Sequence, residues 1–316
     1  MDLGEVFLVS LGGAVLLFCT WKLLRVTQQL FPKTWYPVPK SFFSSLGEWA
    51  VITGGSEGIG RAYAFQLARH GLNIVIISRN LAKLETAAKE IGETTGKEVR
   101  VIVADFTKDD IYEHIEENLT GLNVGVLGKL PNTCILNNVG IIPSHTLCKL
   151  LDIEDLEQRI TSVINCNVKG LMKMCRIVLP RMEKKGKGLI LNMSSGVAGV
   201  PCPLYTMYGA SKLFVERFSR SLQAEYKSKG IIIQAVIPFG VSTAMTNFHK
   251  PDMVTFTPEE FVKASLDYVL VGDCTHGSIS HQILGWILQA IPIQILHSEV
   301  MQEKLSEFVN KSVNGN

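Results

Sequence analysis

Short apolar runs alternate along most of this chain with longer stretches in which apolar residues recur at helical spacing. Helices are predicted at Ile59–His70 and Leu81–Glu93, and a third is predicted to open at Thr107, with Asp110 at the capping-box position. Five apolar runs predict strands: Trp49–Thr53, Asn73–Ser78, Val99–Val103, Gly188–Met193 and Ile231–Ile237. Repeated β-α units with continuously apolar strands indicate an α/β fold in which helices cover both faces of a parallel sheet.

The N-terminal stretch follows a different pattern. Residues 6–21 carry no charge, and Leu23 and Leu24 extend the apolar run past Lys22 to 19 residues, against the ~20 that cross a bilayer. We therefore predict a membrane-anchor helix, with a cleaved signal peptide and a helix lying on the membrane surface as alternatives. No basic segment precedes the run and no clear small-x-small cleavage site follows it, which argues against a signal peptide.

Charge on either side of the apolar run predicts its orientation. Asp2 and Glu5 precede it, and basic residues follow it: Lys22, Arg25, Lys33 and Lys40. By the positive-inside rule, the rest of the protein lies on the cytosolic side of the membrane. The chain is thus divided into an anchor at residues 1–25, a proline-containing linker at residues 26–46 and a single domain at residues 47–316.

A second apolar segment lies near the C-terminus. Ile279–Leu296 is strongly apolar, with Pro292 near its end. Three interpretations are open for this segment: a lid over a substrate pocket, a helix that dips into the membrane, and an ordinary part of the core. An apolar pocket wall would suit a flat apolar ligand.

Composition and charge narrow the classes of partner. The 316 residues carry 31 basic and 29 acidic side chains, a net charge of +2, with no block of like charge. Nucleic acid is therefore not expected as a partner. The seven cysteines are scattered, with no CxxC pair, so neither a disulfide framework nor a metal site is predicted, and a reducing compartment fits best.

A glycine-rich turn, Thr53–Gly60, joins the first predicted strand to the first predicted helix. In this position the backbone can approach the phosphates of a dinucleotide at the helix N-terminus. The second strand ends at Ser78-Arg79, and a cation there suits the 2′-phosphate of NADP(H) better than the 2′-hydroxyl of NAD(H). Arg61 is placed to assist, whereas Glu57 would oppose a phosphate.

Tyr208 and Lys212 are the strongest candidates for acid–base chemistry. Four residues apart on a helix, they lie on one face. A phenol titrates near pH ~10, too high for ready proton exchange at neutral pH. A nearby cation favours the phenolate, so Lys212 is expected to lower the pKa of Tyr208 and make it an acid or base.

Together these motifs resemble the classical short-chain dehydrogenases/reductases. The pattern TGxxxGxG at Thr53–Gly60 is followed in order by Asn137–Gly140, by Ser195 and by Tyr208-x-x-x-Lys212, with 13 residues from Ser195 to Tyr208. The resemblance implies a Rossmann-like, doubly wound parallel sheet. It also implies that Tyr208 donates the proton, that Lys212 and Asn167 support a proton relay, and that Ser195 binds the substrate oxygen. Implied cofactor contacts are Gly54, Ser56, Gly58, Ile59, Gly60, Arg79, Asp105, Asn138, Tyr208, Lys212, Val241 and Thr243.

Within that family the chain resembles the 17β-hydroxysteroid dehydrogenases most closely. The resemblance is carried by stretches such as Gly47–Gly54, Gly71–Val75, Ala104–Ile115 and Val241–Thr246, and it extends through the N-terminal anchor. It implies an endoplasmic-reticulum membrane enzyme that uses NADPH to reduce a 17-ketosteroid, androstenedione, to testosterone. It is also compatible with a homodimer. A very-long-chain 3-oxoacyl-CoA reductase is the alternative, although the C-terminus lacks a dilysine signal, and a non-catalytic dinucleotide-binding membrane protein is the alternative of another class.

Two departures from the family pattern lie close to the predicted site. The usual Pro-Gly is replaced by Pro238-Phe239, which is expected to shape the substrate pocket. About eight extra residues, roughly Gly128–Ile135, precede Asn137. The strand before Asn137 is then either Val124–Leu127 or Thr133–Leu136, and the second choice makes Gly128–Asn132 a surface loop.

Overall fold

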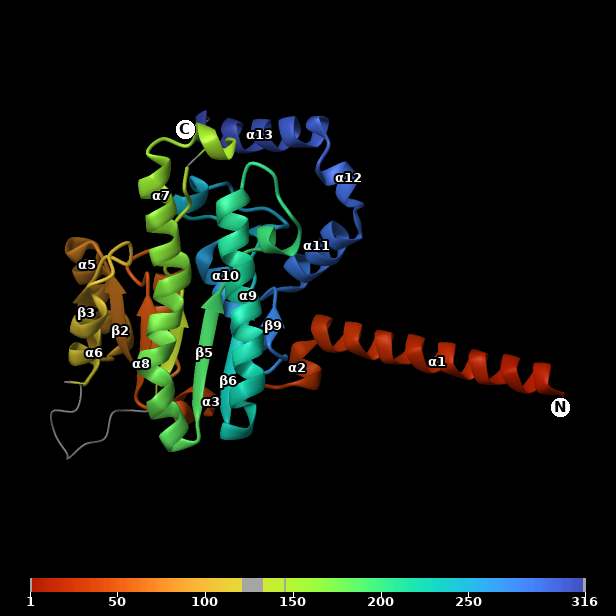
Figure 1. The fold of residues 1–316 in the computed structure, drawn as a ribbon. Coiled ribbons are helices and arrows are strands. Elements are labelled where there is room, and N and C mark those ends of the chain that lie inside the picture. The colour runs from red at the N-terminus through yellow and green to blue at the C-terminus, as the bar shows by residue number, and fades with distance from the viewer. Residues whose placement is uncertain (1, 121–132, 145, 315–316) are drawn as a thin grey trace.

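The central element is a parallel sheet of seven strands, in the order β3-β2-β1-β4-β5-β6-β9 (Figure 1). The computed structural model describes residues 2–120, 133–144 and 146–314. Every predicted strand is present, with a difference of one residue at the end of β6. The strands are β1 Trp49–Thr53, β2 Asn73–Ser78, β3 Val99–Val103, β4 Thr133–Asn137, β5 Gly188–Met193, β6 Ile231–Val236 and β9 Cys274–Thr275.

Helices cover both faces of this sheet, as the continuously apolar strands predict. Alternate residues of β1 enter opposite cores, Ala50 and Ile52 into one and Trp49 and Val51 into the other. The first core is closed by α4 Gly58–Arg69, α5 Leu81–Thr95 and α10 Pro258–Ser265. The second is closed by α6 Tyr112–Thr120, α8 Gly170–Lys185 and α9 Thr206–Tyr226. The expected doubly wound α/β fold is thus confirmed.

The strand before Asn137 is the second of the two predicted choices. β4 pairs in parallel with β1, with Thr133 opposite Trp49 and Asn137 opposite Thr53. This register places the carboxyl end of β4 beside the carboxyl end of β1. The other choice, Val124–Leu127, and the predicted loop at Gly128–Asn132 lie outside the described residues.

The helix predicted to open at Thr107 begins later. Both the backbone N–H and the hydroxyl of Thr107 donate to Asp105 Oδ1, at 3.0 and 2.9 Å. The side chain of Asp105 therefore forms a turn after β3, and α6 begins only at Tyr112. The capping-box prediction at Thr107 and Asp110 was wrong because residues 106–110 form a turn that the Asp105 side chain closes, and not the first turn of a helix.

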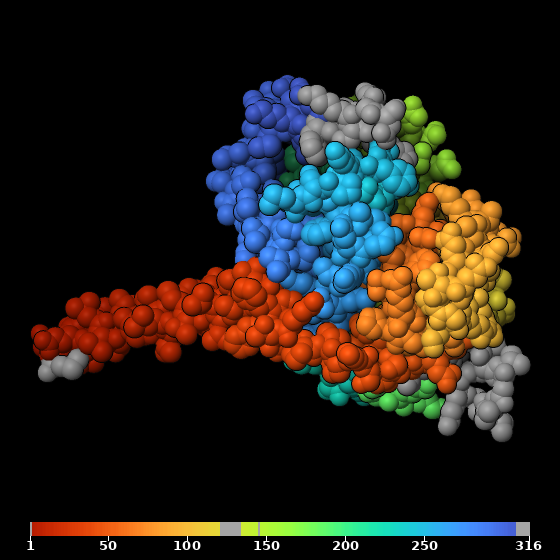
Figure 2. All heavy atoms as spheres, turned by 180° about the vertical axis from the view of Figure 1, so that it is seen from behind, coloured from red at the N-terminus to blue at the C-terminus, as the bar shows by residue number. Residues whose placement is uncertain are grey.

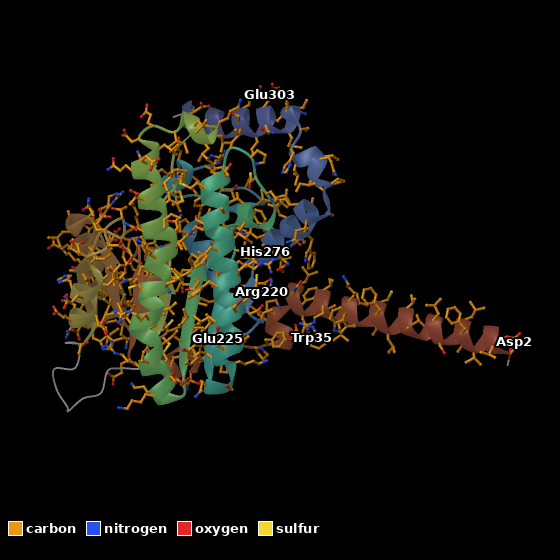
Figure 3. All side chains as sticks on the ribbon, in the orientation of Figure 1. Asp2, Trp35, Arg220, Glu225, His276 and Glu303 are labelled. Atoms are coloured by element: carbon orange, nitrogen blue, oxygen red, sulfur yellow. The ribbon has the colours of Figure 1, made fainter. Side chains whose placement is uncertain are left out.

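The N-terminal apolar run forms one long helix, α1 Leu3–Leu30, in which no residue is buried. Within the part of the chain that the structure describes, it is the one helix long and apolar enough to cross a membrane, with a mean hydropathy of 2.0. It projects from the domain, with Asp2 at its far tip (Figures 2 and 3). The helix continues to Leu30, past the predicted anchor boundary.

The predicted linker is partly packed onto the domain. It contains two short helices, α2 Pro32–Trp35 and α3 Phe42–Leu46. Phe43 and Leu46 are buried in the core that contains α4. The segment after α1 is therefore held against the sheet.

The remaining elements connect or follow the strands and the helices that cover them. α7 Leu156–Val163 runs through a π-helix, η3 Ile164–Lys169, into α8, and the chain ends in α11 Ile279–Ala290, α12 Ile293–Leu296 and α13 Glu299–Asn314. A small sheet joins β7 Gly240–Val241 to β8 Thr255–Phe256. Single turns of 3-10 helix are η2 Leu150–Asp152, η4 Gly196–Gly199, η5 Lys227–Lys229, η6 Ala244–Thr246 and η7 Leu266–Tyr268.

Candidate active site

A cleft of about 650 Å³ opens at the carboxyl ends of the strands. It spans β1 and β4, the point at which the order of the sheet reverses, which is where open α/β sheets bind ligands. The sequence-predicted residues that line it are Gly54, Gly58, Ile59, Arg79, Asp105, Asn138, Ser195, Tyr208, Lys212, Val241 and Thr243. The cleft thus brings together segments that are far apart in the sequence.

The glycine turn is shaped for close approach by a ligand. Gly54 has φ +66°, a conformation that side chains rarely adopt, and a Cβ at Gly60 would lie 2.2 Å from the Gly54 carbonyl oxygen. The N-cap residue of α4, Glu57, forms no side-chain cap, so the first N–H groups of the helix keep their capacity to bind an anion. These features fit a dinucleotide pyrophosphate.

The two candidate arginines differ in their surroundings. Arg79 lines the cleft. Arg61 instead forms an ion pair with Glu90 and lies over the Phe65 ring, 4.8 Å from its centroid, outside the cleft. Of the two arginines, Arg79 is therefore the one that faces the cleft. Glu57 is paired with Lys83 at 2.7 Å, which offsets the negative charge that would oppose a phosphate.

Tyr208 and Lys212 lie one turn apart on α9, as their spacing predicts, and both are buried. The Lys212 ammonium lies 5.7 Å from the centroid of the Tyr208 ring and donates to the Met193 carbonyl at 3.0 Å. Burial lowers the pKa of Lys212 to about 8 because the charged form loses solvent.

The expected lowering of the Tyr208 pKa is not found. Burial raises the pKa of this phenol to about 12, opposed by a hydrogen bond from Ser195. Desolvation is the largest cause because the phenolate would be enclosed in the protein. The phenol of Tyr208 is consequently protonated at neutral pH.

The two adjacent serines have different partners. Ser194 donates its hydroxyl proton to the Lys212 carbonyl at 2.7 Å and is buried, so it ties β5 to α9. Ser195 faces Tyr208 from the following residue. This arrangement agrees with the choice of Ser195 from the 13-residue spacing.

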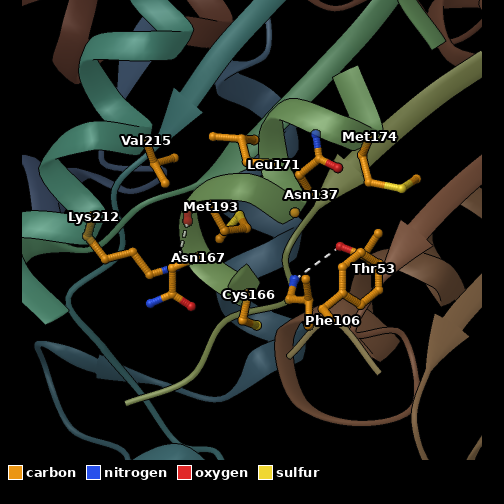
Figure 4. Close-up of a pocket in the computed structure, with 12 residues that line it drawn as sticks. Thr53, Phe106, Asn137, Cys166, Asn167, Leu171, Met174, Met193, Lys212 and Val215 are labelled. Atoms are coloured by element: carbon orange, nitrogen blue, oxygen red, sulfur yellow. Dashed lines mark hydrogen bonds between the residues drawn. The ribbon is translucent and has the colours of Figure 1, made fainter. Parts of the chain in front are cut away.

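Asn167 lies beside Lys212 but outside the main cleft. It comes from the π-helix η3, a local widening that is frequent at functional sites. Its amide donates to the Ile141 carbonyl at 3.0 Å and accepts from the Ile141 N–H at 2.9 Å, which fixes the orientation of its side chain. Asn167 and Lys212 both line a second cavity of about 10 Å³ (Figure 4), close to the smallest volume that holds one water, ~10–15 Å³.

Three other predicted cofactor contacts differ in whether they line the cleft. Ser56 and Gly60 do not line the cleft; the Ser56 hydroxyl donates to that of Ser78 at 3.1 Å and holds the glycine turn against β2. Asn138 lines the cleft and donates from Nδ2 to the carbonyls of Thr53 and Gly54. Its side chain therefore anchors the turn after β1.

Several residues that line the cleft were not predicted from the sequence. The Tyr208 hydroxyl donates to Met245 Sδ at 4.0 Å, and Leu284 of α11 and Leu305 of α13 line the same cleft. Met245 lies within the matching stretch Val241–Thr246, two residues after Thr243, whereas the leucines carry no local signal. Apolar residues of this kind are recognised only when the chain folds them over the site.

Phe239 packs against the segment that carries Ser195. A Cβ at Gly196 would lie 2.2 Å from the Phe239 ring, so the aromatic ring requires a glycine after Ser195. The same ring stacks on His276, with centroids 5.7 Å apart. The departure from Pro-Gly thus adds an aromatic wall beside the cleft.

Fold, cleft and motif together define a dehydrogenase of the dinucleotide-binding type, and the chain belongs to the short-chain dehydrogenase family, whose model matches residues 48–253. The architecture is shared with a short-chain dehydrogenase from Sphingobium yanoikuyae in complex with NADPH. That structure is 26% identical, has a TM-score of 0.63, and aligns over 78% of this chain and 96% of its own.

Two curated relatives are similar over most of the chain. The 17-beta-hydroxysteroid dehydrogenase type 3 of Danio rerio is 57% identical over 309 residues, 98% of each chain. The very-long-chain 3-oxoacyl-CoA reductase of Anas platyrhynchos is 44% identical over 258 residues, 81% of this chain and 80% of its own. The match to the Danio rerio protein includes the N-terminal helix, because it leaves only a few residues of this chain unmatched.

Proposed function

We propose that this protein is an NADPH-dependent reductase that converts a 17-ketosteroid into the 17β-hydroxysteroid, with androstenedione as substrate and testosterone as product. The observation that carries the reaction type is the convergence of Tyr208, Lys212 and Ser195 on the cleft that the glycine turn also lines. The substrate class rests on the nearly full-length likeness to a type 3 17-beta-hydroxysteroid dehydrogenase.

The residues around the glycine turn fit NADP(H). Gly54, Gly58 and Ile59 would hold the pyrophosphate at the start of α4, and Arg79 would pair with the 2′-phosphate. Asp105 and Asn138 would border the adenine region, and Val241 and Thr243 the nicotinamide end. When bound, NADPH supplies the hydride for the carbonyl carbon.

Tyr208 is the proton donor in this proposal. The phenol is protonated at neutral pH, so it has a proton to donate to the ketone oxygen. Ser195 would donate a hydrogen bond to the same carbonyl oxygen, and this bond strengthens as negative charge develops there. Lys212 and Asn167 would return a proton to Tyr208 through a water in the small cavity that they share.

Apolar side chains favour a lipid-like substrate. Met245, which accepts a hydrogen bond from Tyr208, lines the cleft together with Leu284 and Leu305. A pocket with apolar walls and a few convergent polar groups orients a ketone while excluding water. The C-terminal segment thus serves as a lid through its inner face.

We further propose that α1 anchors the enzyme in the endoplasmic-reticulum membrane with the catalytic domain facing the cytosol. The charges at the two ends of α1 support this orientation: Glu5 lies at its far end, and Lys22 and Arg25 lie toward the domain. The proposed division remains an anchor at 1–25, a linker at 26–46 and a catalytic domain at 47–316. A homodimer stays a prediction.

The proposal is tested with microsomes from cells that express the full chain. We expect NADPH-dependent conversion of androstenedione to testosterone. Turnover of a 3-oxoacyl-CoA in its place would establish the alternative that the Anas platyrhynchos relative represents. Folded protein that reduces neither substrate would overturn both activities and leave a non-catalytic dinucleotide-binding protein.

A further inference from the structure

We propose that α11 and α12 form a second membrane contact, through an isoleucine face made of Ile279, Ile283, Ile287, Ile293 and Ile295. This inference rests on the proposed anchoring of α1 in a membrane. The outer side of α11 and α12 would contact lipid. The inner side of this segment lines the cleft.

The exposed isoleucines of α11 lie on one side of the helix. Ile279, Ile283 and Ile287 are four residues apart and are 47%, 42% and 54% exposed, and this spacing places them along one face. The buried residues of the same helix, His281, Gln282 and Gly285, lie on the other side. The helix is therefore apolar on the face that the domain does not cover.

Exposed isoleucines also occur in α12. After Pro292 the chain turns into Ile293–Leu296, in which Ile293 and Ile295 are 42% and 49% exposed. No Asp, Glu, Lys or Arg occurs between Asp273 and Glu299. An uncharged segment with five exposed isoleucines is unusual on a soluble domain and indicates a contact with another apolar phase.

Its position favours lipid as the occupant. α11 contacts α1, whose last five residues, 26–30, are half-buried where the helix meets the domain. Figures 1 and 2 show α11 and α12 on the side of the domain from which α1 projects. A membrane crossed by α1 therefore faces the isoleucine face.

Side chains near the domain end of α1 mark the depth of the membrane boundary. Trp21 is 53% exposed and lies under the Arg25 guanidinium, 5.5 Å from it, and Lys22 lies at the same distance from the Phe18 ring. Aromatic and basic residues of this kind collect at the headgroup level. α11 contacts the same helix.

The arrangement also relates the membrane to the cleft. Leu284, between Ile283 and Gly285, faces the cleft, so α11 separates the cleft from the proposed lipid contact by one helix. A steroid concentrates in the bilayer because it is apolar. The isoleucine face would thus keep the active-site cleft close to the bilayer, which contains the substrate.

Quenching of tryptophan fluorescence by brominated lipid tests the contact directly. In the full chain, Trp21, Trp35, Trp49 and Trp286 are replaced by phenylalanine, and one reporter is introduced, Ile287→Trp. The matched control carries Ile160→Trp instead, at an exposed isoleucine of α7, which lies across the domain from α11 (Figure 1). Both proteins are reconstituted into phosphatidylcholine vesicles with brominated acyl chains.

We expect strong quenching of the Ile287→Trp reporter and none of the Ile160→Trp reporter. Equal, weak quenching of both in vesicle-bound, folded protein would overturn the proposal and leave a protein partner for this face. If the substituted background does not fold, photoactivatable phosphatidylcholine is cross-linked to the unchanged chain. Adducts within residues 279–295 support the contact, and adducts confined to α1 overturn it. Neither readout needs turnover, so failure of the ketosteroid assay is distinguished from failure of the membrane contact.

Discussion

The imidazole of His281 joins α11 to Val254 by donating from Nε2 to the Val254 carbonyl at 2.9 Å. Its other nitrogen, Nδ1, accepts from the backbone N–H of Phe239 at 3.3 Å. A peptide N–H only donates and a carbonyl only accepts, so these two bonds require the neutral imidazole with its proton on Nε2. One buried histidine therefore holds both ends of the loop that carries Val241 and Thr243.

This arrangement predicts that acid destabilises the loop and the domain. Burial lowers the pKa of His281 and of neighbouring His276 below their ordinary value. The unfolded chain therefore binds more protons than the folded chain as the pH falls below about 6.5, and stability decreases toward the lowered pKa values. Thermal unfolding should show a lower melting temperature at pH 5.5 than at pH 7.5.

The control for this pH effect is a histidine at the surface. His281→Phe should reduce the difference between the two melting temperatures, because the variant lacks one group that must be protonated. His114→Phe, at an exposed position of α6, should leave the difference as it is. An unchanged pH dependence in His281→Phe would contradict the role assigned to this imidazole.

Replacing Tyr208 by phenylalanine removes the proposed proton donor while keeping the ring. A positioned general acid contributes about 10²- to 10⁴-fold to a rate, so kcat for ketone reduction should fall by about that factor. NADPH affinity, measured by fluorescence titration, should change far less. Tyr226→Phe, near the end of the same helix, should retain wild-type kcat. Full activity in Tyr208→Phe would refute the mechanism.

Arg79 should decide the preference between the two nicotinamide cofactors. A hydrogen bond to a charged group contributes about 1.5–3 kcal/mol, so Arg79→Ala should weaken NADPH binding by about 10- to 100-fold and leave NADH binding nearly unchanged. The matched control is Arg61→Ala, because Arg61 is paired with Glu90 outside the cleft. An equal loss of NADPH affinity in both variants would place the 2′-phosphate elsewhere.

A methyl group at Gly196 should disturb the aromatic wall. Gly196→Ala places a Cβ against the Phe239 ring, and overpacking of this kind costs about 1–3 kcal/mol. The melting temperature should fall and KM for the ketone should rise, since Ser195 precedes the altered residue. Gly199→Ala, in the same turn, has ordinary space around its Cβ, with Gln289 at 3.7 Å, and should be tolerated. Gly196→Ala with wild-type stability would mean that Phe239 can move aside at no cost.

Sequence patterns located the strands closely because each is a continuous apolar run between polar or glycine-rich turns. β1, β2, β3 and β5 have the predicted bounds. The helix expected at Thr107 was misplaced because its capping signal competed with the side chain of Asp105, two residues upstream. A local signal is reliable where only one set of hydrogen bonds can satisfy the backbone. It fails where a nearby side chain offers a second set.

The candidate site was likewise predicted from the sequence only in part. Tyr208, Lys212 and Ser195 were predicted because their types and spacing are characteristic, and they do line one cleft. The pKa of Tyr208 was predicted in the wrong direction. The spacing on the helix identifies the neighbouring charge of Lys212, but it does not show that the phenol is buried. Burial depends on what the rest of the chain packs over the phenol.

The sequence by itself determined the α/β class, the parallel sheet, the glycine turn and the position of Tyr208 and Lys212, because these follow from periodicity and short spacing. Only the tertiary structure decided that Asn137 pairs beside Thr53, that Arg79 and not Arg61 faces the cleft, and that Leu284 closes it. The physical reason is that register, burial and ion pairing are set by contacts between residues far apart in the chain. No window of sequence contains both partners of such a contact.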